Sequence, residues 1–455
     1  MRPSNCLVRS QILVLTALLF SGLITSCQAG TAPAETTEGV IETPPVTAVS
    51  AESPSEPPDD TPTPVPQPTT ALVLEASEVE YIIPIHIQHK TQDQLFLMFE
   101  LVQALDGQVY WWPADGSHRD ASSIPFDAGE ARHLLSIRGL ASGQTYQIAV
   151  GLEGDDGVDR MPLFMGEPWG PIEISTLADA PLPVTIGVFG DSGFGENLTA
   201  DLATQLAQHQ PDFIVHTGDL VYSAFEQGSP QEAYRLKWYQ TLTSLLQSTV
   251  IYPVVGNHEL YADASQLGLP YYFYAFPMLE GLSGGWQEAP PGAERQWYAL
   301  ELGPLQMLFL NTQQLYGGLA RAQQDAWLKS RLADERFDAS IVVFHVPPFT
   351  SGRYSQDGLV VASAWVPEFE ASNVVLVLSG HDHNYQRLEH NGITYLISGG
   401  GSSVLYPFEQ GRNDSLRFEA RSHFLLLEVG LESIELNAFD SAGGIFDSAT
   451  ISLAQ

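Results

Sequence analysis

Five short polar clusters in this chain each follow a run of apolar residues that has the length and composition of a buried β-strand. Their side chains with metal-binding chemistry are Asp191, Asp219, Tyr222, Asn257, His345, His381 and His383. Oxygen and nitrogen donors without a thiolate suit iron, zinc or manganese. Two such cations about 3.5–4 Å apart can share a carboxylate, hold the oxygens of a phosphate ester and lower the pKa of bound water. The clusters therefore predict a binuclear metallohydrolase.

The apolar runs indicate how these clusters come together. The runs are Val184 to Phe189, Phe213 to Val215, Ile251 to Val255, Ile341 to Phe344 and Val374 to Leu378. Helical stretches near Leu198 to Gln208 and Gln231 to Leu246 separate the first three, which is typical of central strands in a helix-covered sheet. Ligands of open α/β sheets bind beyond the carboxyl ends of the strands, so we expect all five clusters to meet in one crevice.

The last part of the chain has another pattern. Phe424 to Val429, Ile434 to Phe439 and Thr450 to Leu453 are predicted to be antiparallel strands at an edge. Residues 181–455 together are expected to form the catalytic domain.

Residues 71–180 have short alternating apolar runs separated by Gly and Asp turns, without a long helical period, which predicts a β-sandwich. The turn and strand from Gly139 to Tyr146 resemble those of a fibronectin type III domain. In such domains the tyrosine hydroxyl is bound to the preceding turn.

The N-terminus resembles an export signal. Arg2 and Arg9 precede an apolar stretch from Ile12 to Ile24 that is short for a transmembrane helix. Residues 1–27 end in a sequence that resembles a bacterial lipobox, with Cys27 as the lipidated residue; an ordinary cleaved signal is the alternative. Residues 28–70 are rich in Thr, Pro, Glu, Ser and Ala and are expected to be a disordered tether. The predicted location is outside the cytoplasm, lipid-anchored to a bacterial membrane.

Charge limits the possible partners. The chain has 19 Lys+Arg against 54 Asp+Glu, a formal net charge of -35, which repels nucleic acid at long range. We therefore expect no nucleic-acid partner, and a small phosphate ester would have to be held by local cations.

Taken in order, the five clusters resemble those of the calcineurin-like metallophosphoesterase superfamily, over about Val184 to Leu405. Most of that superfamily has Asp-x-His in the first cluster, but here Gly193 stands at the position of the histidine. Purple acid phosphatases combine this loss with a Tyr three residues after the second Asp, where this chain has Tyr222. The resemblance implies a four-layer α/β (α+β) sandwich, preceded here by the smaller all-β fibronectin III-like domain.

The resemblance also implies a distribution of ligands. It puts Asp191, Asp219, Tyr222 and His383 on one ion, and Asp219, Asn257, His345 and His381 on the other. Iron(III) is expected at the Tyr222 site because a phenolate is a hard donor, with iron(II), zinc or manganese at the second. A metal-bound hydroxide would attack phosphorus in line.

His258 follows Asn257 directly. It is expected to orient the phosphate or to protonate the leaving oxygen, and a purely structural role is the alternative.

Substrate preference stays open at this level. Many family members have a further substrate-contacting His after the fourth cluster, whereas residues 346–357 contain none, and Arg353, expected to be solvated, is their only cation. Phosphomonoester hydrolysis is the leading hypothesis. The alternatives are a phosphodiesterase acting on nucleotides or lipid headgroups, and a non-catalytic surface binding protein.

Overall fold

The computed structural model describes residues 81–152, 171–222, 228–261, 268–278, 296–318 and 320–453. The predicted signal segment with Cys27 and the predicted tether lie outside these ranges. The described residues belong to one compact unit. Within them, no helix has the length and apolar character needed to cross a membrane.

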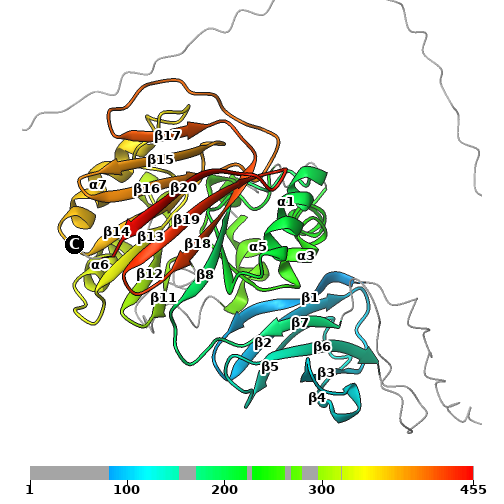
Figure 1. The fold of residues 1–455 in the computed structure, drawn as a ribbon. Coiled ribbons are helices and arrows are strands. Elements are labelled where there is room, and N and C mark those ends of the chain that lie inside the picture. Colours follow the sequence, from blue (N-terminus) through cyan, green and yellow to red (C-terminus); the bar gives the residue numbers. More distant parts are fainter. Residues whose placement is uncertain are drawn as a thin grey trace, which may run out of the picture. The chain divides into compact units, whose positions relative to one another are not determined.

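The first described region is all β, drawn in blue and cyan in Figure 1. Its elements are β1 (Tyr81–Lys90), β2 (Gln94–Leu101), β3 (Gly107–Pro113), the 3₁₀ turn η2 (His118–Asp120), β4 (Ser122–Phe126), β5 (Arg132–Arg138), β6 (Thr145–Leu152) and β7 (Ile172–Ser175). They form two antiparallel sheets in the orders β1-β2-β5 and β4-β3-β6-β7. The Tyr146 hydroxyl accepts a hydrogen bond from Ala141 N at 2.8 Å, which confirms the predicted tie to the preceding turn.

A six-stranded sheet carries the first three polar clusters. Its order is β10 (Val250–Pro253), β9 (Phe213–His216), β8 (Val184–Phe189), β18 (His423–Val429), β19 (Ser433–Asp440) and β20 (Ile445–Ser452). The strands β8, β9 and β10 are parallel, as their apolar runs predicted. The edge position predicted for residues 424–429 and 434–439 is wrong, because β18 pairs with both β8 and β19, and β19 with both β18 and β20. Only the last predicted strand, which lies in β20, is at the edge of the sheet.

A seven-stranded sheet carries the other two clusters. Its order is β11 (Tyr298–Leu302), β12 (Leu305–Phe309), β13 (Ala339–Val343), β14 (Val374–Ser379), β16 (Ile393–Ser398), β15 (Tyr385–His390) and β17 (Ser415–Glu419). Strands β12, β13, β14 and β16 are parallel, so the segments that follow β13 and β14 leave the same edge.

Helices pack on the outer faces of these two sheets, α1 (Asn197–Gln208) on the six-stranded sheet and α6 (Arg321–Leu332) and α7 (Gly358–Glu370) on the seven-stranded one (Figure 1). The other helical elements are α2 (Pro230–Tyr234), the π-helical η4 (Arg235–Gln240), α3 (Thr243–Leu246), α4 (Asn257–Tyr261), α5 (Gly268–Ala275) and the 3₁₀ η6 (Thr312–Tyr316). The single helix predicted near Gln231 to Leu246 is instead three short segments, α2, η4 and α3.

The core follows from the alternation of the strands. In β13, Ile341 and Val343 join the cluster between the sheets, whereas Val342 joins Trp327 and Trp365 of α6 and α7 on the other side. The result is helix, sheet, sheet, helix, so the predicted four-layer fold with a preceding β-sandwich is confirmed.

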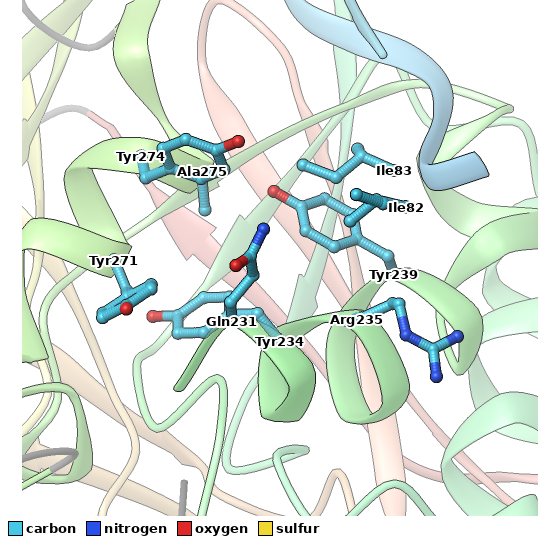
Figure 2. Close-up of a pocket in the computed structure, with 9 residues that line it drawn as sticks. All are labelled: Ile82, Ile83, Gln231, Tyr234, Arg235, Tyr239, Tyr271, Tyr274 and Ala275. Carbon is cyan, nitrogen blue, oxygen red and sulfur yellow. The ribbon is translucent and has the colours of Figure 1, made fainter. Parts of the chain in front are cut away.

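Strand β1 packs against β10 and α5. His89 Nδ1 lies 2.7 Å from the Tyr252 hydroxyl, and Gln88 Nε2 donates to the Ala275 carbonyl at 3.0 Å. A cavity nearby is walled by tyrosines of η4, α2 and α5, with Gln231 between them (Figure 2). It offers only about 10 Å³, which is room for one water molecule, and none of the candidate metal ligands lines it.

Candidate metal centre

Three of the predicted ligands lie on strained backbone immediately after a strand. Asp191 after β8, Asp219 after β9 and His381 after β14 have φ angles of 56°, 55° and 68°. Residues other than glycine rarely adopt this left-handed region, and such strain is concentrated at functional sites. The turns direct these side chains to a common point instead of along the strand.

Five of the seven predicted ligands form two overlapping groups. Donor atoms of Asp219, His345 and His381 lie within 4.8 Å of one another, and so do those of Asp191, Asp219 and His383. Asp219 is common to both groups, as the carboxylate shared by two cations must be. The division is the same as that implied by the family resemblance.

The remaining two predicted ligands complete these groups. The Tyr222 hydroxyl lies 3.2 Å from Asp191 Oδ1 and 2.9 Å from His383 Nε2. Asn257 Oδ1 lies 3.0 Å from His345 Nε2. The structure thus brings all seven residues together, and their role in holding metal stays a prediction.

Each histidine has one ring nitrogen directed into the centre and the other held by a neighbour. Nδ1–H of His345 donates to the Thr217 carbonyl and that of His383 to the Val404 carbonyl, both at 2.8 Å. His381 is oriented the other way, with Nε2 3.1 Å from Asp357 Oδ2. Such partners set the tautomer of a ligating imidazole and orient its second nitrogen.

The acidic groups of the centre are almost completely buried. Burial raises the pKa of Asp191 well above its ordinary value, and burial also raises that of the Tyr222 hydroxyl. Burial alone would raise the pKa of Asp219 too, but the charge of His345 beside it lowers that pKa. Burial alone would lower the pKa of His345, and the Asp219 carboxylate raises it to about 10. Without a cation the raised pKa values keep Asp191 and Tyr222 protonated, whereas a metal ion beside them would favour their ionised, ligating forms, so the donor set fits two metal ions.

His258 lies beside the centre and lines its pocket. Its backbone N–H donates to Asp219 Oδ1 at 3.0 Å, and its ring lies 4.3 Å from that of Tyr222. Burial lowers the pKa of its imidazole. The side chain is half-buried and lines the same cavity as Asp219 and His381, where a substrate group could reach it.

Two further acidic residues support the turns. Glu259 accepts three backbone hydrogen bonds, from Asp219 N, Leu220 N and Gly256 N, at 3.0, 2.8 and 2.7 Å. Asp382 accepts from Thr350 Oγ1 and from Arg353 N. Neither side chain is directed at a predicted metal position.

Gly193 has a steric reason to be glycine. A Cβ atom there would lie 2.5 Å from Val221 N and 2.6 Å from the carbonyl carbon of Leu220. The first loop therefore packs directly on the backbone that leads to Tyr222, and Tyr222 N donates to the Gly193 carbonyl at 2.9 Å. The exchange of His for Gly and the presence of Tyr222 belong to one local arrangement.

The centre opens into a pocket of about 370 Å³. Its described lining residues are Asp219, Asn257, His258, Gln313, Tyr316, Val346, Tyr354, Asp357, His381, His383 and Tyr406. The ring of Tyr406 stacks on that of His383 at 4.3 Å, and the ring of Tyr354 lies 4.4 Å from that of His381. Aromatic side chains of the pocket lining thus pack on the rings of two of the predicted ligands.

Sequence reasoning missed Asp357, Tyr354 and Tyr406. Asp357 and Tyr354 lie in the segment where the family's further His was sought, so their position after the fourth cluster was the available signal. Tyr406 follows β16 and has no motif around it; only the fold brings it to His383. Arg353 is exposed, as expected, and packs over the rings of Tyr354 and Tyr406.

Comparison with known proteins finds phosphoesterases that are similar to the segment with the polar clusters. Residues 184–385 match the calcineurin-like phosphoesterase family. An uncharacterized protein of Mycobacterium tuberculosis is 22% identical over 239 residues, which are 48% of this chain and 43% of that protein. The tartrate-resistant acid phosphatase type 5 of Rattus norvegicus is 30% identical over 135 residues, which are 28% of this chain and 41% of that enzyme. The chain thus spans less than half the length of each of these two relatives.

A solved structure shares the fold. The purple acid phosphatase PPD1 from seeds of yellow lupin, Lupinus luteus, superposes with a TM-score of 0.60 at 17% identity. The match covers 81% of this chain and 74% of the lupin chain, so it includes more than the segment with the polar clusters.

Proposed function

Because residues 184–385 match the calcineurin-like phosphoesterase family, we propose that this protein hydrolyses phosphate monoesters at a two-metal centre. The observation that carries the proposal is the position of Asp219, whose carboxylate belongs to both groups of candidate ligands. The acid phosphatase of Rattus norvegicus among the relatives supports the same reaction class.

We assign one ion to Asp191, Asp219, Tyr222 and His383, and the other to Asp219, Asn257, His345 and His381. Iron(III) is proposed at the first position because the buried phenolic oxygen of Tyr222 is a hard donor, and iron(II), zinc or manganese at the second. When bound, the pair would neutralise phosphate charge and lower the pKa of water.

Side chains beside the two ions would handle the leaving group and exclude water. The half-buried imidazole of His258, next to the shared carboxylate, is proposed to donate a proton or a hydrogen bond to the leaving oxygen. Tyr354 and Tyr406 would shield the centre from bulk water, because they cover the rings of His381 and His383.

We further propose that the protein works outside the cytoplasm, on a lipid anchor at Cys27. Support comes from the export-like N-terminus and from the Pro- and Thr-rich composition of residues 28–70. Labelling with a radioactive fatty acid in a bacterial host, compared between the wild type and Cys27→Ser, tests the anchor.

The main test uses the purified full chain. We expect two metal ions per chain, a visible band from a tyrosinate–iron(III) pair, and faster turnover of phenyl phosphate than of diphenyl phosphate. Tyr222→Phe should remove the band. Tyr298→Phe is the matched control, because Tyr298 is also fully buried and its hydroxyl donates to the Pro253 carbonyl instead.

The outcomes separate the parts of the proposal. A colourless, active, iron-free protein would exclude iron at the Tyr222 position and leave the two-metal hydrolase intact. Faster turnover of the diester would replace the monoesterase by a phosphodiesterase. Metal-loaded protein that hydrolyses neither ester would refute the enzyme and favour a binding protein.

A further inference from the structure

Four exposed apolar side chains line the metal-centre pocket or are close in the chain to residues that line it. We call Tyr316, Leu359, Val404 and Phe408 the apolar rim; they are 48%, 58%, 36% and 54% exposed. The described chain has nine large hydrophobic residues with this degree of exposure, so four of them belong to the surroundings of one pocket. Single exposed apolar residues are ordinary, but a contiguous group beside a cavity marks a binding surface.

Each member of the rim is tied to a residue that lines the pocket. Tyr316 itself lines it, and its hydroxyl donates to the Asp357 carbonyl at 2.6 Å. Leu359 lies two residues after Asp357, at the beginning of α7.

The other two members border the opposite part of the lining. The Val404 carbonyl accepts from His383 Nδ1, and Phe408 lies two residues after Tyr406. Backbone hydrogen bonds from Glu409 N and Gln410 N to the Ser351 carbonyl hold this loop against the segment that carries Tyr354 and Asp357. Each member of the rim thus lines the pocket or lies within two residues of one that does.

The charge of the pocket argues against a second anionic group on the substrate. None of its described lining residues is Lys or Arg, and one carboxylate beyond the predicted ligands, that of Asp357, stands at its edge with its side chain 47% exposed. Arg353 packs over the outer side of the tyrosine pair and does not line the pocket. Val346, Tyr354 and Tyr406 provide uncharged walls between the metal centre and the rim.

We propose that the apolar rim binds the leaving group of the substrate, and that the substrate is a phosphate monoester of an apolar alcohol. This inference rests on the proposed function. In the reaction the ester P–O bond breaks, a water oxygen bonds to phosphorus, and a proton goes to the alkoxide oxygen, so that an alcohol and inorganic phosphate leave. The phosphate lies at the metal centre and the hydrocarbon extends over Leu359 and Phe408.

The test is a homologous series of n-alkyl phosphates from ethyl to octyl, kept below their micellar concentrations. All have a primary alcohol as leaving group, so its pKa is constant and only apolar length changes. Full transfer of one methylene from water to an apolar environment corresponds to about a four-fold change. A rim that covers one side of the chain should give about a two-fold rise in kcat/KM per methylene. The affinity of the matching alkylphosphonates, measured by calorimetry without turnover, should rise in parallel.

Two variants and a control locate the effect. Leu359→Ser and Phe408→Ser should flatten both series, because a longer alkyl chain then gains no further apolar contact on the rim. Leu431→Ser should keep the slope, because Leu431 is 71% exposed in the turn between β18 and β19 and has no tie to the pocket among the described contacts.

The results distinguish this inference from the proposed function. A flat series in the wild type, with ethyl phosphate hydrolysed, would overturn the rim and leave the phosphatase standing. No hydrolysis but a persisting slope for phosphonate affinity would overturn the phosphatase and leave the rim. Preference for a phosphate ester with a terminal carboxylate, lost in Arg353→Gln, would overturn the apolar substrate in favour of a dianionic one.

Discussion

Replacing Gly193 by alanine should damage both the stability of the protein and its Tyr222 metal position. The added Cβ atom would lie 2.5 Å from Val221 N and 2.6 Å from Leu220 C, whereas non-bonded heavy atoms separate to about 3.5–4.0 Å. The two loops must therefore move apart by about 1 Å. Both obstructing atoms belong to backbone, so no side-chain rotation can relieve the contact.

The magnitude follows from the kind of contact. Overpacking of this type costs about 1–3 kcal/mol, and the lower entropy of the unfolded alanine chain offsets about 0.5 kcal/mol of it. We expect the free energy of unfolding to fall by about 1–2 kcal/mol. A displacement of about 1 Å exceeds the tolerance of about 0.2 Å for metal–ligand distances. Bound metal should therefore fall from two ions per chain towards one. Gly193→His, which restores the residue common in the superfamily, should lose at least as much stability and metal as Gly193→Ala.

Urea unfolding and elemental analysis of the purified protein measure the two effects. Gly430→Ala is the control, because its Cβ would make an ordinary contact of 3.5 Å with the Ser433 carbonyl and the glycine has no positive φ. Its stability should stay within about 0.5 kcal/mol of the wild type. Wild-type stability together with two bound ions in Gly193→Ala would refute the argument that this glycine exists to let the loops approach.

Two further predictions concern groups around the centre and in the sandwich. Glu259→Ala leaves three buried N–H groups without their acceptor, each costing about 1–3 kcal/mol, so the free energy of unfolding measured in urea should fall by several kcal/mol. Glu259→Gln keeps one oxygen, so its loss of stability should be smaller. A loss below about 1 kcal/mol in Glu259→Ala would contradict the role assigned to Glu259. Burial lowers the pKa of Lys90 to about 8 from an ordinary 10.5, so the unfolded chain binds more protons between these values and stability should rise with pH there. Below pH 8, Lys90→Met should be more stable than the wild type, and this difference in the free energy of unfolding should shrink by about 3 kcal/mol by pH 11. A difference that does not change with pH would show that Lys90 is hydrated in the folded protein.

The sequence predicted the chemistry of the centre better than its surroundings. Asp191, Asp219 and His381 could be found because each comes two or three residues after a strand, and the end of a strand has a known place at the edge of a sheet. The edge position predicted for residues 424–429 was wrong because an apolar antiparallel strand pairs equally well on one side or on both. Tyr406 could not be found, because its approach to His383 depends on how the loop after β16 returns across the sheet.

The amino-acid sequence by itself determined the types of ligand, their order along the chain and the paired presence of Gly193 and Tyr222. These are local properties, set by which residues follow an apolar strand. Only the tertiary structure decided that Glu259 binds the backbone of the second turn, that Tyr406 stacks on His383, and that Tyr354 and Asp357 approach His381. These facts depend on two sheets packing face to face, which brings together segments that are up to about two hundred residues apart in the chain.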